Sequence, residues 1–359
     1  MTPYERVMAA IAGKDFDMHP VINPTSVVTL GCMKELGVYF PKAHTDPGEM
    51  AALAARGHEH FRFDSIMPYF SIHLEAAALG AKIDWKDANN TPQTIGKPIR
   101  NLDNFKLSDL CADENLNTDL NLNLNNNFLE QKYFQKLLRA ISILRKKYGG
   151  KVPIIGKVIG PWTLAYNLYG VENMLLDIIL EPGKVAALIK ELSHVPIEFA
   201  KEQFNAGADI ITWGEHVTSD LVSPQIYQDL VLPIHQKAAL ELESIGPIIL
   251  HICGNVMDRL EAIKSTGFRL FHLHSHNDVP AALKAVSGKI QLVGGVNNPF
   301  TLTQSTPENV RKEVESYLED GINIISAECA IPCNTPEQNL FALTKITHRY
   351  KCRGVANRH

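Results

Sequence analysis

From about residue 150 onward, the sequence alternates short apolar runs with longer amphipathic stretches, and this alternation restricts the fold more than any other feature. The amphipathic stretches have the lengths of helices. Several end in a glycine just before the next apolar run, as at Gly207, Gly246, Gly267 and Gly321. A glycine past a helix end, followed by a buried strand, is typical of repeated βα units. The pattern therefore predicts a parallel sheet covered by helices.

Eight short runs are candidates for the strands of this sheet. They are Pro20–Asn23, Ser65–Pro68, Val152–Val158, Asp209–Trp213, Pro247–Cys253, Leu270–His274, Ile290–Val296 and Asn323–Ala327. The helices expected between them include Val185–Asn205, Ser223–Ile245, Val256–Ser265 and Pro307–Glu319. Eight units favour a closed barrel over an open doubly wound sheet, and no Gly-rich dinucleotide-binding motif follows any of the runs. We predict an α/β fold in which residues 1–359 form a single (β/α)8 TIM barrel domain.

Residues 113–127 do not fit this pattern, because seven of the fifteen are asparagine. Asparagine side chains compete with the backbone for hydrogen bonds and disfavour regular structure. The leucines of the segment alternate, so a short exposed strand is one alternative. We predict instead a mobile surface insertion within the domain.

Composition excludes several classes of partner. The formal net charge is −4, and there is no run of Lys and Arg long enough for a nucleic-acid surface. No stretch approaches the ~18 continuous apolar residues of a membrane span, and the first residues carry no apolar core of a secretion signal. Six cysteines in 359 residues are too sparse for a disulfide framework. We expect a cytoplasmic protein that binds neither nucleic acid nor membrane.

The residues with the clearest chemistry are His251 and Cys253, at the end of a predicted strand. Side chains two apart on a strand point to the same face, and active sites of α/β barrels form where the strands end. Cys329 follows the last predicted strand and reaches the same end, and Cys333 competes with it for a role as third ligand. One His and two Cys form a zinc-type set that leaves a position open for substrate. The alternative is that each Cys is a small buried apolar side chain.

Three histidines at alternate positions, His272, His274 and His276, mark the next predicted strand. Alternation would place their imidazoles on one face, beside the strand that carries His251. One of them could complete a tetrahedral shell around the metal when substrate is absent. The alternative is a solvated polar rim at the strand end.

Two further segments could support the site. Glu215 closes another predicted strand, and a carboxylate there could orient a zinc-bound His through its second ring nitrogen. A helix cap or loop contact is the equal alternative for Glu215. The backbone amides of Asn297 and Asn298, after a Gly-Gly pair, could hold an anionic group of a cofactor, although Gly-Gly before a turn is frequent.

Several motifs stand in an order that resembles the uroporphyrinogen decarboxylase superfamily. They are Gly160–Ala165, Gly207–Asp209, Leu221–Pro224, His251–Gly254 and Thr335–Pro336. Within that superfamily, the chain is similar to the methylcobamide:coenzyme M methyltransferases. The resemblance covers nearly the whole chain except residues 113–127.

This resemblance implies a (β/α)8 barrel that holds zinc by a His-x-Cys pair and a distant Cys. The distant Cys maps onto Cys329, in preference to Cys333. The family's methyltransferases have acidic residues where this chain has His274–His276, and a glutamate there can be zinc's extra ligand, so His274 is expected in that place. The glycines that flank the family's distant Cys are replaced here by Glu328 and Ala330.

The implied activity is methyl transfer from a methylated corrinoid (a methylcobamide), carried by a partner corrinoid protein, to a small thiol such as coenzyme M. The alternatives are the same zinc chemistry with another acceptor (tetrahydrofolate or another thiol), and a non-catalytic partner of a corrinoid protein with structural zinc. The superfamily's decarboxylases use no metal and hold a polycarboxylate with N-terminal arginines. Here the first sixty residues contain only Arg6 and Arg56, which disfavours decarboxylation.

Overall fold

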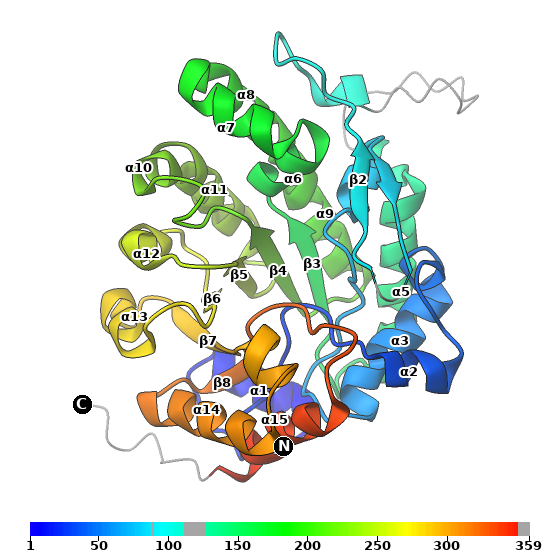
Figure 1. Ribbon diagram of the computed structural model, residues 1–359, viewed down its shortest axis with the longest axis vertical. Helices are drawn as coiled ribbons and strands as arrows, with labels where there is room; N and C mark the ends of the chain where they lie inside the picture. Colours follow the sequence, from blue (N-terminus) through cyan, green and yellow to red (C-terminus); the bar gives the residue numbers. More distant parts are fainter. Residues whose placement is uncertain (88–89, 111–126, 351–359) are drawn as a thin grey trace.

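The centre of the protein, in a computed structural model that describes residues 1–87, 90–110 and 127–350, is a six-stranded parallel sheet (Figure 1). Its strands follow one another in chain order: β3 (Ile155–Ile159), β4 (Ile210–Glu215), β5 (Ile248–Ile252), β6 (Leu270–His272), β7 (Gln291–Val296) and β8 (Ile324–Ala327). Residues 113–126, most of the Asn-rich segment, lie outside the described residues. The prediction that this segment is a mobile insertion therefore stays a prediction.

Two extended segments complete the barrel between β8 and β3. Val21 forms a parallel bridge with Ile325 of β8, and Ile66 forms one with Ile154, just before β3. The Asp64 amide donates to the Val21 carbonyl at 2.6 Å, which joins the two segments to each other. The predicted (β/α)8 barrel is confirmed. The first two predicted strands are reduced to single bridges, because prolines at both ends of 20–24 and at 68 have no N–H to donate to a ladder.

Helices cover the outside of the sheet (Figure 1). The α-helices are α1 (Pro3–Ile11), α2 (Leu30–Leu36), α3 (Pro47–Glu59), α4 (Leu74–Ala78), α5 (Lys132–Tyr148), α6 (Pro161–Leu168), α7 (Val171–Leu180), α8 (Pro182–Leu192), α9 (His194–Ala206), α10 (Pro224–Ile226), α11 (Leu232–Leu242), α12 (Leu260–Ile263), α13 (Val279–Val286), α14 (Pro307–Asp320) and α15 (Glu337–Arg349). Shorter 3-10 or π turns are η1 (Lys42–His44), η2 (Leu107–Leu110), η3 (Asn127–Glu130), η4 (Tyr227–Val231), η5 (Met257–Arg259) and η6 (Asn298–Leu302). A two-stranded antiparallel ladder, β1 (Lys82–Asp84) with β2 (Gln93–Gly96), lies apart from the six-stranded sheet.

Prolines explain why two of the predicted helices are divided. The stretch expected as one helix over 185–205 is α8 and α9, separated at Ser193, and Pro196 lies in the first turn of α9. The stretch over 223–245 is α10, η4 and α11, and Pro233 lies in the first turn of α11. Proline is tolerated in a first turn, where its missing N–H has no helical partner in any case, so each helix restarts next to it.

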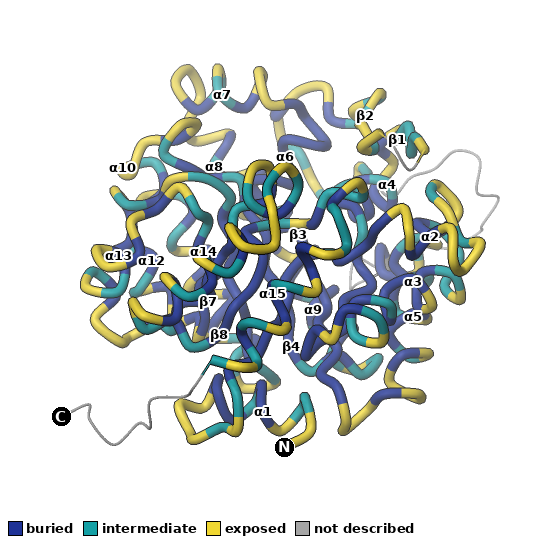
Figure 2. The backbone as a smooth tube through the Cα atoms, turned by 60° about the horizontal axis from the view of Figure 1, so that its bottom comes forward, coloured by how far each residue is buried: buried dark blue, intermediate teal, exposed yellow. Residues whose placement is uncertain are grey.

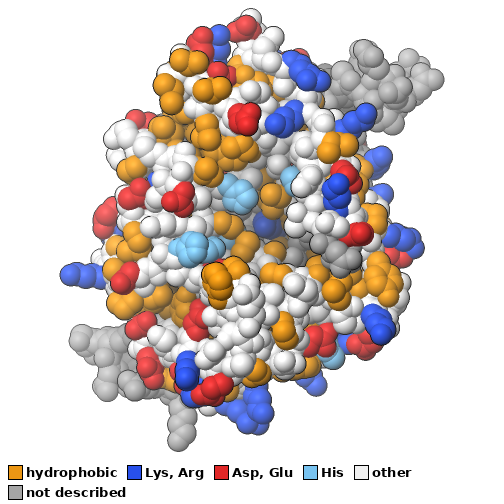
Figure 3. Space-filling model, in the orientation of Figure 1, with side chains coloured by type: hydrophobic (Ala, Val, Ile, Leu, Met, Phe, Trp, Pro, Cys, Tyr) orange, Lys and Arg blue, Asp and Glu red, His pale blue; other side chains and the backbone are white. Residues whose placement is uncertain are grey.

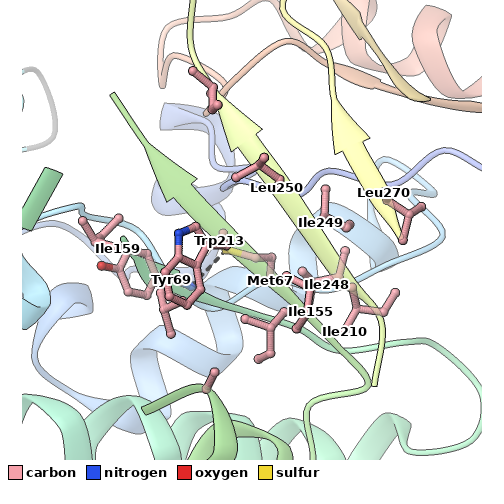
Figure 4. Packing of buried hydrophobic residues seen from close by; sticks show 14 of the residues in the cluster. Met67, Tyr69, Ile155, Ile159, Ile210, Trp213, Ile248, Ile249, Leu250 and Leu270 are labelled. Carbon is pink, nitrogen blue, oxygen red and sulfur yellow. Dashed lines mark hydrogen bonds between the residues drawn. The ribbon is translucent and has the colours of Figure 1, made fainter. Parts of the chain in front are cut away.

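The core lies between the sheet and its helices (Figure 2). Every residue of β3, β4 and β5 is buried. Figure 4 shows Ile155, Ile210 and Ile248 packed together from these three adjacent strands. Burial of each such side chain contributes about 1.5–3 kcal/mol, so the strand ends that carry the functional residues are held rigidly. Among the described residues, no helix is long and apolar enough to cross a membrane.

A buried carboxylate, Asp64, ties three distant parts of the chain together where the barrel closes. It accepts hydrogen bonds from Arg6 Nη1 at 2.6 Å and from the Val21 amide at 2.9 Å. Its Oδ2 also lies 2.8 Å from His348 Nε2. Asp64 therefore links α1, the first bridge segment and α15 around the position where regular strand pairing is missing.

Replacing this carboxylate should destabilise the fold. In Asp64→Ala, Arg6 and the Val21 amide lose a buried partner, and we expect the free energy of unfolding to fall by about 3–5 kcal/mol. Urea denaturation followed by circular dichroism measures the loss. The exposed Asp15→Ala is a matched control that should change stability by less than about 0.5 kcal/mol. A loss below about 1 kcal/mol for Asp64→Ala would show that this network does not hold the barrel closed.

Candidate metal centre

The sheet brings together three of the residues singled out in the sequence. His251 is buried in β5, and Cys253 follows the end of the same strand. Cys329 comes two residues after the end of β8. Because parallel strands end at the same side of a barrel, the two strand ends meet there. Residues far apart in the chain, His251, Cys253 and Cys329, thus form one cluster whose ligand atoms all lie within 4.8 Å of one another.

The spacing within the cluster suits ligands of a single metal ion. His251 Nε2 lies 3.0 Å from Cys253 Sγ and 3.7 Å from Cys329 Sγ, and the two sulfur atoms are 3.6 Å apart. Tetrahedral zinc with Zn–S of about 2.3 Å and Zn–N of about 2.0 Å would separate sulfur atoms by ~3.8 Å and nitrogen from sulfur by ~3.6 Å. A disulfide would need the sulfur atoms about 2.05 Å apart. The group can therefore hold a metal ion.

The pKa shifts of the Cys253 and Cys329 thiols also indicate a place for a metal ion. Hydrogen bonds from Cys253 and His251 hold the pKa of Cys329 well below its usual range, whereas the Cys329 sulfur and burial raise the pKa of Cys253 well above it. Two neighbouring thiolates in a buried place repel each other, so the protein alone favours one thiolate and one thiol. A bound dication would remove this conflict and allow both to ionise. The donor set therefore fits a soft divalent ion.

His274 lies outside the three-residue cluster. The strand β6 ends at His272, and a turn closed by the Asn277 amide and the His274 carbonyl follows. The His274 Nδ1 atom is 3.3 Å from Glu328 Oε2, next in sequence to Cys329. A role for His274 as a ligand stays a prediction.

The alternation predicted for the three histidines is wrong beyond His272, because of that turn. His272 is fully buried, its Nε2 lies 2.8 Å from the Ala327 carbonyl oxygen, and its ring centroid is 4.7 Å from that of His251. His276, by contrast, is exposed. The three imidazoles therefore have three different environments.

Glu215 makes the capping contact that was the alternative in the sequence. Its Oε2 accepts from the amide of Thr163 at 3.0 Å and from the hydroxyl of Thr163 at 2.8 Å. It makes no hydrogen bond to His251 in the described structure, where His251 Nδ1 is buried without a partner. Glu215 therefore holds the start of α6 against the end of β4.

The amides of Asn297 and Asn298 are occupied by carboxylates of the protein itself. The Asn297 amide donates to Glu313 Oε1 at 2.8 Å, and the Asn298 amide donates to Glu328 Oε1 at 3.0 Å. The prediction that these amides hold an anionic group of a cofactor stays a prediction. Here Glu328 fills one of them and so fixes the loop that carries Cys329.

Comparisons with known proteins place this site in a family. The model of the uroporphyrinogen decarboxylase family, described as "Uroporphyrinogen decarboxylase (URO-D)", matches residues 2–350. The chain belongs to the uroporphyrinogen decarboxylase family. This confirms the superfamily to which the motifs pointed.

Several relatives that match nearly the whole chain are methyltransferases. The chain is 31% identical over 348 residues to a methylated-thiol–coenzyme M methyltransferase of Methanosarcina mazei, covering 96% of this chain and 89% of that protein. It is 29% identical over 353 residues to the methylcobamide:CoM methyltransferase MtbA of Methanosarcina acetivorans, covering 98% of each. A solved structure of a methyltransferase from Methanosarcina mazei superposes with a TM-score of 0.88 at 27% identity, covering 97% of this chain and 98% of that one.

A polar group that the sequence interpretation missed lies in the interior of this uroporphyrinogen decarboxylase-family barrel. Lys157 is buried on β3, and its Nζ lies 5.6 Å from the centre of the Tyr69 ring. The Tyr69 hydroxyl donates to Glu75, whose other oxygen accepts from the Ile159 amide at 2.9 Å. The signal was present in the sequence, because Lys157 is a charged residue within an apolar strand-like run.

The visible face of the molecule is hollowed near its centre (Figure 3). Histidine side chains gather at this hollow, and its surroundings are mostly hydrophobic or uncharged, whereas Lys, Arg, Asp and Glu side chains concentrate toward the periphery. Such a hollow, apolar with a few polar groups, suits a small ligand better than a highly charged one.

The buried carboxyl of Glu75 should make stability depend on pH. Burial raises its pKa from 4.5 to about 7, so the folded protein retains this proton more tightly than the unfolded chain does. The contribution is full below pH 4.5 and is lost as pH rises through about 7, by ~3 kcal/mol in total at 1.36 kcal/mol per unit.

Glu75→Gln removes this titration. Urea denaturation from pH 4.5 to 8 should show the stability of wild type falling relative to the variant across that window. Parallel pH profiles for the two proteins would contradict the shifted pKa.

Proposed function

We propose that this protein is a zinc-dependent methyltransferase that moves a methyl group from a methylated corrinoid, carried by a partner corrinoid protein, to a small thiol, most simply coenzyme M. The observation that carries the proposal is the cluster of His251, Cys253 and Cys329 at the end of the barrel strands. The names of the full-length relatives support the donor and the acceptor.

The three ligand residues leave one corner of a tetrahedron for the acceptor. Zinc bound by them would hold the acceptor's sulfur as a thiolate near neutral pH, where a free alkyl thiol of pKa ~8.5 is mostly protonated. In the absence of acceptor, we propose that His274 takes the fourth position. Glu328 supports both His274 and Cys329. Its carboxylate faces the His274 imidazole, and it directly precedes Cys329 in the chain.

The transfer itself is a displacement at carbon. The acceptor sulfur attacks the methyl carbon, a sulfur–carbon bond forms, and the cobalt–carbon bond breaks with its electron pair left on cobalt. Cobalt therefore goes from Co(III) to Co(I), and the proton of the thiol is released to solvent. The half-buried position of Cys253 and Cys329, at the strand ends rather than within the strands, leaves the acceptor sulfur accessible to a corrinoid from the barrel mouth.

Decarboxylation of a polycarboxylate is poorly supported, because the N-terminal arginines are already engaged. Arg6 pairs with Asp17 at 2.8 Å and with Asp64 at 2.6 Å, and its side chain is buried. Arg56 pairs with Glu35 at 2.5 Å. Both guanidinium groups are thus already paired with carboxylates of the protein itself.

Two alternative functions also use the metal site but differ in the methyl acceptor or in whether the protein is a catalyst. One is methyl transfer to tetrahydrofolate or another thiol. The other is a non-catalytic partner of a corrinoid protein with a structural zinc. Structural zinc is normally closed by four protein ligands, and the cluster in the described residues has three. An open position favours catalysis.

Metal binding should depend on two of the cysteines and not on a third. Wild type should purify with about one zinc per chain, whereas Cys253→Ala and Cys329→Ala should lose most of it, because two ligands cannot hold the ion tightly. Cys333→Ala is the matched control, because Cys333 lies outside the cluster, and it should retain zinc. Elemental analysis of the purified proteins measures this. Equal zinc in all four proteins would place the metal elsewhere.

Turnover is tested with free methylcobalamin, whose colour changes as its methyl group is lost. Wild type with coenzyme M should demethylate it, with release of one proton, and X-ray absorption should show one additional sulfur in the zinc shell when the thiol is added. Tetrahydrofolate and other thiols in the same assay distinguish the first alternative. Four protein ligands that no thiol displaces, together with no turnover, would support the structural-zinc alternative.

A further inference from the structure

Lys157 is the one lysine that is buried within the described part of the chain, and its strand, β3, is separated by β4 alone from β5, which carries His251. It is 6% exposed and lies in the middle of β3, where every residue is buried. A Cβ added to Gly214 of β4 would lie 3.1 Å from Lys157 Cε and 3.6 Å from Ile159 Cδ1. Lys157 and Ile159, two apart on the strand, therefore share one face, and the lysine side chain crosses over Gly214.

Gly214 connects this lysine to the metal cluster. In the β4–β5 ladder Gly214 is the direct partner of His251, one of the three candidate metal ligands. The aliphatic part of the Lys157 side chain therefore lies over the residue that pairs with His251. The positive charge of Lys157 acts on both thiols: it slightly opposes the rise in the pKa of Cys253 and adds slightly to the fall in the pKa of Cys329. Because residue 214 has no side chain, the ammonium group can extend toward the metal cluster.

The protein supplies no anionic partner for this ammonium group. Among residues 1–87, 90–110 and 127–350, Lys157 Nζ has no ion pair or hydrogen bond, and it lies 5.6 Å from the centre of the Tyr69 ring. Both oxygens of the nearby Glu75 already accept, from Tyr69 and from the Ile159 amide. Lys157 is 6% exposed, so its three N–H donors have little access to water, and an anionic ligand in the barrel could pair with them.

We propose that Lys157 binds the anionic end of the methyl acceptor, and so selects thiols that carry a sulfonate or carboxylate a few bonds from the sulfur. This inference rests on the proposed function. The acceptor would then be held at two points, its sulfur at the open corner of the His251–Cys253–Cys329 cluster and its anion at Lys157. A thiol with a neutral or cationic tail would leave the lysine unpaired.

A second explanation for the buried Lys157 is that it acts on the metal cluster and not on the acceptor's tail. Its charge could simply offset the negative charge of the thiolates at the metal cluster. In that case every thiol acceptor would depend on Lys157 equally, whatever its tail. The dependence on the tail therefore separates the two explanations.

The experiment compares acceptors of similar size in wild type and Lys157→Met, which keeps the length of the side chain and removes its charge. The probes are 2-mercaptoethanesulfonate, 3-mercaptopropionate, 2-mercaptoethanol and 2-mercaptoethylamine, with methylcobalamin as donor. We expect the ratio of kcat/KM for the anionic thiols to that for 2-mercaptoethanol to fall about 10- to 100-fold in Lys157→Met, the loss of one charge-assisted hydrogen bond. The exposed Lys284→Met is the matched control and should leave this ratio unchanged.

Gly214→Ala is a second, independent variant, because its methyl group would displace the lysine stem. It should lower the same ratio several-fold. Thermal melting and zinc content verify that each variant is folded and loaded; Lys157→Met should melt no lower than wild type, because it removes a buried charge without a partner. An unchanged ratio in Lys157→Met, or an equal loss with all four thiols, would overturn the proposal.

A binding measurement keeps the inference separate from the proposed function. Ethanesulfonate has the anion but no thiol, and calorimetry at millimolar concentration reports its binding without turnover. Binding to wild type that is lost in Lys157→Met supports the anion site even if no thiol is ever methylated. Equal binding to both proteins, or none to wild type, would overturn it.

Discussion

The structure depends on one electrostatic constraint, the placement of two thiols and an imidazole within 3.7 Å of one another in a half-buried position. Two thiolates that close cannot both be ionised without a cation, which is why the pKa of Cys329 falls while that of Cys253 rises. A metal ion bound by the three atoms would remove this conflict, as proposed above. Next to the cluster, Glu328 accepts a hydrogen bond from the Asn298 amide and so fixes the loop that carries Cys329.

The barrel supplies the rigidity that this constraint requires. His251 is held by the β4–β5 ladder, and Cys329 by the segment that follows β8, so their separation depends on the whole sheet and not on one loop. The sheet has regular pairing only from β3 to β8. The remaining gap is closed by single bridges at Val21 and Ile66 and by the buried carboxylate of Asp64. The hydrogen bonds of Asp64 therefore take the place of the regular ladder that two further strands would form.

Features that depend on residues close together in the chain could be predicted from the sequence, and features that depend on tertiary packing could not. The alternation of side chains along a strand is enough to predict that His251 and Cys253 share a face. The repeated helix-glycine-strand pattern is enough to predict the barrel. Choosing Cys329 over Cys333 needed the family resemblance, because spacing along the chain does not say which loop residue turns inward. The partners of Glu215 could not be predicted, because they depend on how β4 packs against α6. The strand predicted to run to His274 ends two residues earlier, at His272, because a turn follows it.

Lys157 shows how charge balance can set specificity in such a site. A dication with two thiolates and a neutral imidazole would carry no net charge, so the cluster itself would not need the charge of Lys157. Glu75 does not cancel the lysine's charge, because burial raises its pKa to about 7 and leaves much of it protonated at neutral pH. An acceptor with an anionic tail would therefore meet an uncompensated cation within the barrel, whereas a cationic tail would be repelled. In the proposed site, the same buried charge would give the preference for an anionic acceptor.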